Sequence, residues 1–142
     1  MMKILQLLTV FHLFLCPCES HGGEKILLYS AKNIELGRVV KFGFIKNGFP
    51  PEKERWNPSS NTGVKLDDII ARGRQTLRQL GCAEAEKREI TAIEVEKITG
   101  IEQQVWVAFI SFRDKNSPHP SSGPGNFFRV MVPLDKTLLY TE

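Results

Sequence analysis

The sequence is poor in the residue types that carry chemistry or crosslink a fold. Its 142 residues include three cysteines and three histidines, and none follows the Cys-x-x-Cys or His-Glu-x-x-His spacing of metal sites. A P-loop, a dinucleotide-binding glycine pattern and the Gly-x-Ser-x-Gly turn of hydrolases are also absent. We therefore expect no cofactor, no metal and no catalytic residues.

A strong charge of either sign is missing as well. Lys and Arg total 19 against 16 Asp and Glu, a formal net charge of +3, and the two signs are interleaved along the chain. Nucleic-acid binding needs basic residues clustered on one face, so we expect no nucleic-acid partner.

Only one apolar run is long, and it lies at the N-terminus. Lys3 precedes the run Ile4–Leu15, and Pro17 follows it. The segment ends at Ser20, with small residues at the positions that signal peptidase needs just before its cleavage site. The run is shorter than the roughly 20 residues of a membrane span. We expect residues 1–20 to be a signal peptide that is removed, with a retained N-terminal anchor as the alternative. The mature chain is then secreted or periplasmic and has no membrane span.

Two cysteines fall inside this leader. Neither Cys16 nor Cys18 follows the small residues that precede a lipidated cysteine, so we expect no lipid anchor. Cleavage after Ser20 would leave Cys82 alone, and an intramolecular disulfide is then excluded. The core must stabilise the fold by itself, which domains of about this size can do. We expect Cys82 to be a buried or half-buried structural thiol.

Alternation and turn residues predict six strands. In Arg38–Ile45, Val40, Phe42 and Phe44 share one face at a period of two. The strands are expected at residues 24–29, 38–45, 89–98, 105–112, 126–132 and 138–140. Residues 47–63 and 114–125 are rich in proline, glycine and polar residues and should form two long loops.

One helix is expected over Val64–Leu80. Its apolar residues fall on one stripe at helical spacing: Leu66, Ile69, Ile70, Gly73, Leu77 and Leu80. Gly73 on that stripe indicates a close approach to a strand. Asn61 or Thr62 should cap the start, and Gly81 should end the helix.

The strand 105–112 is apolar on both sides, which is typical of a strand covered on two faces. Either the segment 24–63 covers its second face, or Trp106, Ile110 and Phe112 form an exposed patch that a partner or a second copy buries. Residues 21–142 should then form a single α+β domain. We expect one amphipathic helix packed on an antiparallel sheet of about four to six strands.

Residues 64–142 resemble two families of exported α+β domains. Val130–Thr137 followed by Leu138 resembles the final strand–Asp–turn–strand of PepSY-like domains. Gln103–Val107 resembles the Q-x-V-x-G hairpin of cystatins, with Val107 in the glycine position. Val132–Leu134 resembles their Pro-Trp hairpin, with Leu134 in the tryptophan position. The resemblance to cystatins implies that the protein inhibits cysteine proteases by inserting these two hairpins as a wedge into the protease cleft.

These observations favour an exported, non-enzymatic binding domain of unknown ligand. The alternatives are a cystatin-like cysteine protease inhibitor and a small enzyme without a recognisable motif, for which Glu94 and Glu96 share one strand face. A protein partner or self-association would use the long loops or the second sheet face. The candidate partner-binding residues are Trp56, Gln103, Val105, Trp106, Pro133 and Leu134.

The leader gives the first testable prediction. N-terminal sequencing of the exported protein should begin at or near His21, because Pro17 and Ser20 place the cleavage site there. A cytosolic product that begins at Met1 would contradict the assignment of a signal peptide.

Overall fold

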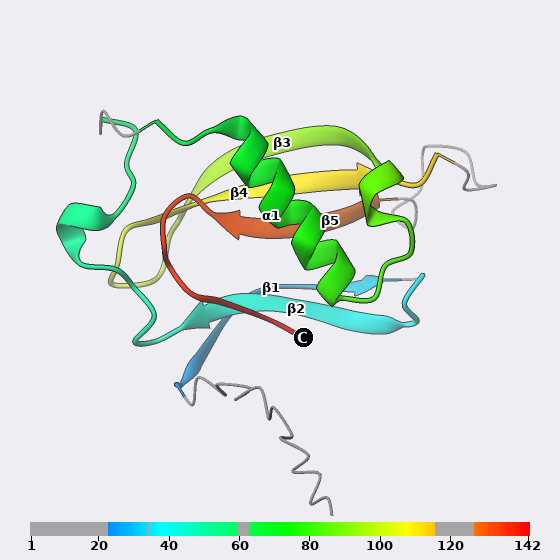
Figure 1. The fold of residues 1–142 in the computed structure, drawn as a ribbon. Coiled ribbons are helices and arrows are strands. Elements are labelled where there is room, and N and C mark those ends of the chain that lie inside the picture. The colour runs from blue at the N-terminus through cyan, green and yellow to red at the C-terminus, as the bar shows by residue number, and fades with distance from the viewer. Residues whose placement is uncertain (1–22, 34, 60–62, 116–126) are drawn as a thin grey trace, which may run out of the picture.

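The computed structural model describes residues 23–33, 35–59, 63–115 and 127–142. The expected signal peptide, the candidate caps Asn61 and Thr62, and most of the loop 114–125 lie outside these ranges. The elements, shown in Figure 1, are β1 (Lys25–Asn33), β2 (Arg38–Ile45), the 3-10 turn η1 (Glu52–Glu54), α1 (Leu66–Gln79), the 3-10 turn η2 (Ala85–Lys87), β3 (Glu89–Ile98), β4 (Val105–Arg113), β5 (Phe127–Pro133) and β6 (Leu139–Thr141).

The α+β character is confirmed, but the strands do not form one sheet. They divide into two antiparallel sheets of three, in the orders β1-β2-β6 and β3-β4-β5. The chain crosses from the second sheet to the first between β5 and β6. Pro133 has no N–H group to extend the ladder of β5. Leu138 then donates to the carbonyl of Gly48, which leads β6 alongside β2.

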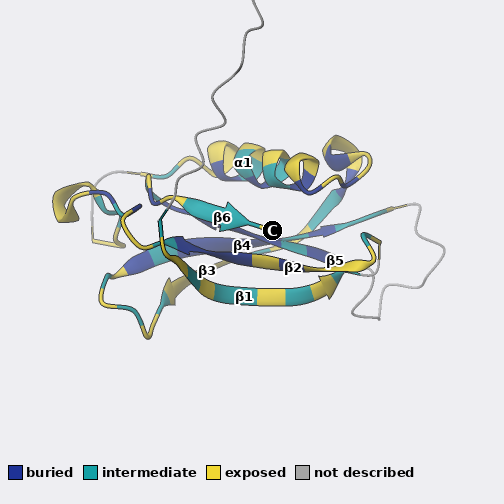
Figure 2. Ribbon diagram, turned by 90° about the horizontal axis from the view of Figure 1, so that it is seen from below, coloured by how far each residue is buried: buried dark blue, intermediate teal, exposed yellow. Residues whose placement is uncertain are grey.

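Strand β4 is covered on both faces. On one side α1 lies across β4 and β5 (Figure 1), and a Cβ added at Gly73 would come 2.7 Å from Ile110 Cδ1. On the other side the ring of Phe109 meets the ring of Tyr29 from β1 at 5.9 Å. Figure 2 shows α1 along one side of the strands, with buried residues concentrated beneath it.

The alternative of an exposed patch at Trp106, Ile110 and Phe112 is therefore wrong. Ile110 and Phe112 are fully buried because α1 packs on them, and Trp106 is half-buried. The close approach predicted at Gly73 is confirmed, since any side chain there would displace Ile110.

Helix α1 ends as predicted and begins differently. Gly81 has φ +85°, its N–H donates to Arg78, and the N–H of Cys82 donates to Leu77, which is a glycine-terminated helix end. The N-cap is Lys65, without a side-chain hydrogen bond. Leu66 is 55% exposed, so it does not belong to the buried stripe of the helix. Within the described residues, no helix has both the length and the apolar character to cross a bilayer.

The helix stripe gives a second prediction. Leu77 is fully buried, so Leu77→Ala should lower the free energy of unfolding by about 2–5 kcal/mol. Arg78 is exposed and pairs with Glu86, so Arg78→Ala is the matched control and should stay within about 0.5 kcal/mol. Denaturant unfolding measures both, and small effects of equal size would contradict this packing.

Candidate functional site

The two tryptophans of the sequence meet at one end of the molecule. Trp56 follows η1 in the loop between β2 and α1, and Trp106 is the second residue of β4. Their ring centroids are 5.8 Å apart at an interplanar angle of 79°, an edge-to-face contact. Both side chains are half-buried and pack against the core.

A pocket of about 420 Å³ opens beside the two rings, and we call it the tryptophan pocket. Its volume lies within the range of small-molecule sites. The lining residues come from the η1 segment and from the loop and strand start at β4: Glu52, Arg55, Trp56, Asn57, Glu102, Gln104 and Trp106. The pocket therefore joins two segments that are far apart in the sequence.

Hydrogen bonds hold the backbone of both tryptophans in place. The backbone N–H of Trp56 donates to Asp135 Oδ2 at 3.2 Å, while Asp135 Oδ1 accepts from the backbone N–H of Thr137 at 2.9 Å. Beside them, the Leu134 N–H donates to the Trp106 carbonyl at 3.0 Å. The corner between β5 and β6 thus fixes the backbone of both tryptophans.

The η1 segment is ordered by its own contacts. Arg55 Nε donates to the Pro50 carbonyl at 3.0 Å, and the Arg55 N–H donates to the Glu52 carbonyl at 3.1 Å. Farther along, Asn57 Oδ1 accepts from the Ser59 N–H at 2.9 Å. These short-range bonds place Glu52, Arg55 and Trp56 along one side of the tryptophan pocket.

The structure separates the six predicted partner-binding residues into two groups. Trp56 and Trp106 come together in the pocket, and Gln103 is half-buried in the loop before β4. Val105, Pro133 and Leu134 are buried, so they support the site from the core. The sequence reasoning missed Glu52, Arg55, Asn57, Glu102 and Gln104, although these polar residues flank the two tryptophans in the sequence.

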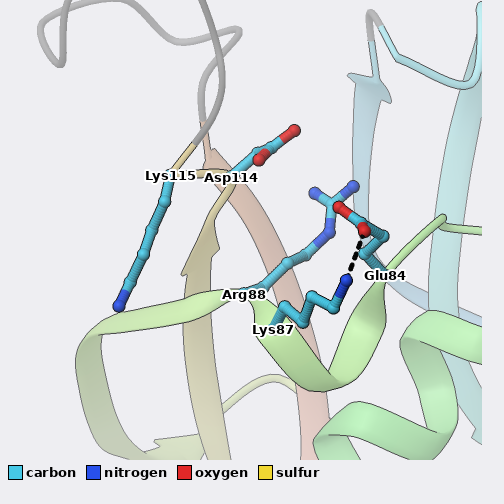
Figure 3. A pocket seen from close by; sticks show the side chains of 5 residues that line it. All are labelled: Glu84, Lys87, Arg88, Asp114 and Lys115. Atoms are coloured by element: carbon cyan, nitrogen blue, oxygen red, sulfur yellow. Dashed lines mark hydrogen bonds and ion pairs between the residues drawn. The ribbon is translucent and has the colours of Figure 1, made fainter.

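A second pocket, of about 400 Å³, is lined by charged residues of η2 and of the segment after β4 (Figure 3): Glu84, Lys87, Arg88, Asp114 and Lys115. Lys87 Nζ binds Glu84 Oε1 at 2.8 Å, and this carboxylate raises the pKa of the lysine. Arg88 is buried, and its guanidinium pairs with Glu35 and donates to the Ala83 carbonyl. These two cations already have partners, so we assign them a structural role.

The other candidate groups are also engaged or inaccessible. Burial raises the pKa of the Cys82 thiol to about 11, which disfavours the nucleophilic thiolate at neutral pH. Glu94 and Glu96 both bind Arg129, at 2.9 and 3.4 Å, and its guanidinium lies over the Phe109 ring at 4.1 Å. In the part of the chain that the structure describes, no three His, Cys, Asp or Glu side chains gather as a metal site.

Comparison with protein-family models, with curated proteins and with solved structures found no match. The tryptophan pocket itself therefore provides the chemical basis for a function. That pocket combines two aromatic rings with carboxylates, amides and a guanidinium. Such a set can both bury an apolar surface and exchange hydrogen bonds with a ligand.

The anchor at Asp135 gives a third prediction. In Asp135→Asn one oxygen remains for Thr137, but the amide nitrogen cannot accept from the Trp56 N–H. The loss of that bond should lower stability by about 1 kcal/mol and shift tryptophan emission to longer wavelength. Asp68→Asn on the exposed surface of α1 is the control. Identical emission spectra for the wild type and Asp135→Asn would show that the anchor is unimportant.

Proposed function

We propose that this protein is an exported, non-enzymatic binding domain whose ligand occupies the tryptophan pocket. One observation carries the proposal: Trp56 and Trp106 meet half-buried at the pocket and are fixed there through Asp135 and Leu134. Tryptophan is enriched among the residues that dominate binding energy, because its large ring gains much from losing contact with water. The leader-like N-terminus supports export.

Binding rather than catalysis is supported by the state of the reactive groups. The buried Cys82 thiol is held protonated, and the carboxylates of Glu94 and Glu96 are bound to Arg129. The protonated thiol is not an activated nucleophile, and the ion-paired carboxylates are not free to act as a general base. A small enzyme is the alternative in which Glu52 and Glu102, at the tryptophan pocket, would act on the bound ligand.

The cystatin-like alternative uses a different part of the chain. Its wedge would be Gln103–Val107, but Val105 and Val107 are fully buried in β4. Exposing these two side chains to a protease would remove them from the core. We therefore favour the tryptophan pocket over this segment as the binding site.

The fourth prediction tests the pocket without assuming its ligand. The protein contains two tryptophans, so an NMR spectrum of the isotope-labelled chain should give two indole N–H signals. In a screen with a library of small polar and aromatic fragments, the fragments that bind should shift these two signals. Trp56→Ala should abolish the shift of the Trp106 signal, because the pocket loses one wall.

Lys87→Ala is the matched control, since it alters the second pocket and leaves the first intact. This variant should bind the fragments as the wild type does. If fragment shifts mapped to η2 and were lost in Lys87→Ala, or if no fragment shifted either indole signal, the proposed site would be wrong.

A further inference from the structure

We infer that the tryptophan pocket takes a neutral, polyhydroxylated ligand, namely a monosaccharide or disaccharide unit. The inference rests on the proposed function and names the chemical class of its ligand. Three properties of the pocket carry it: the balance of charge around it, the mixture of donors and acceptors in its lining, and the corner formed by its two aromatic rings.

The charges around the pocket nearly cancel. The charged lining residues are Glu52, Glu102 and Arg55. Lys97 lies directly opposite Trp106 in the pairing of β3 with β4, so its side chain is on the same face of the sheet.

This balance disfavours a charged ligand. An anion such as phosphate would meet two carboxylates, whereas a quaternary ammonium ion would meet Arg55 and Lys97 beside the aromatic rings. Aromatic rings attract cations through the electrostatic field of their faces, and the positive charges of Arg55 and Lys97 would oppose a cation bound there. A neutral ligand incurs neither repulsion.

The hydrogen-bonding groups match hydroxyl groups. A hydroxyl donates one hydrogen bond and accepts others, so a polyhydroxylated ring needs both kinds of partner side by side. Carboxylates at Glu52 and Glu102 accept, the Arg55 guanidinium donates, and the side-chain amide of Gln104 does both. The pocket therefore offers both kinds of partner around one opening.

The two indoles provide the apolar part of the site. A sugar ring has one face made largely of C–H groups, and an indole is a flat surface on which such a face can pack. Rings at 79° with centroids 5.8 Å apart form a corner, so a flat ring can lie along one indole and abut the other. The volume of about 420 Å³ lies near the lower end of small-molecule sites and suits one or two sugar rings.

The test is a titration of the full mature chain with a panel of soluble saccharides. The panel contains glucose, galactose, mannose and N-acetylglucosamine, with the disaccharides maltose, cellobiose, lactose and chitobiose. Calorimetry and tryptophan fluorescence should detect binding of at least one of them. The affinity should not change between low and high salt, because a neutral ligand gains nothing from unscreened charges.

Three variants separate the contributions. Trp56→Ala should weaken saccharide binding at least about tenfold, through the loss of an aromatic wall. Glu102→Gln should change it by less than about threefold, since the amide oxygen still accepts a hydrogen bond. Lys87→Ala should bind like the wild type, and circular dichroism should show that each variant is folded.

Other outcomes would overturn the inference in distinguishable ways. If choline or arginine bound instead, with affinity lost at high salt and in Glu102→Gln, the ligand would be a cation and the binding function would stand. If no saccharide in the panel bound while fragments still shifted the indole signals, the saccharide class would be wrong and the pocket right. Release of reducing sugar from a disaccharide would show an enzyme and contradict the proposed non-enzymatic function.

Discussion

The structure depends on one constraint, which is that β4 must be covered on both of its faces. Both faces of the strand are largely apolar, and Val105, Val107, Ile110 and Phe112 are fully buried. One helix can cover only one side of this strand. The second side is closed by β1, where Tyr29 meets Phe109 and Arg129 spans both rings. The division into two sheets follows, because β1 and β2 must leave the plane of β3-β4-β5 to reach that side.

The same constraint creates the candidate site. Where β4 begins, Trp106 projects near the edge of the covered region and is met by Trp56 from the loop between β2 and α1. The crossover from β5 to β6 passes this point and supplies the Leu134 N–H and the Asp135 carboxylate as anchors. The segment that joins the two sheets is therefore also the segment that anchors the backbone of both tryptophans at the pocket.

Local features of the fold were predictable from the sequence, and long-range ones were not. The alternation in 38–45 and 89–98 predicted both ends of β2 and of β3 correctly. Gly73 allows the close approach of a strand and Gly81 ends the helix, as their positions in the helix pattern indicated. The pairing of β6 with β2 depends on contacts far along the chain, which periodicity does not encode. The salt bridge of Arg88 with Glu35 is of the same kind. For the site, the two tryptophans stood out as candidates, but Glu52 and Glu102 are ordinary surface carboxylates until the fold brings them together.

The tryptophan pocket is thus the place where we propose that a neutral ligand meets this protein. The most direct measurement is a crystal structure of the mature chain with the tightest-binding saccharide of the panel. We predict a sugar ring packed on Trp56 or Trp106, with its hydroxyl groups within hydrogen-bond distance of Arg55 and Glu102. A ligand bound instead at the pocket of Lys87 and Arg88, with the tryptophan pocket left empty, would contradict this proposal.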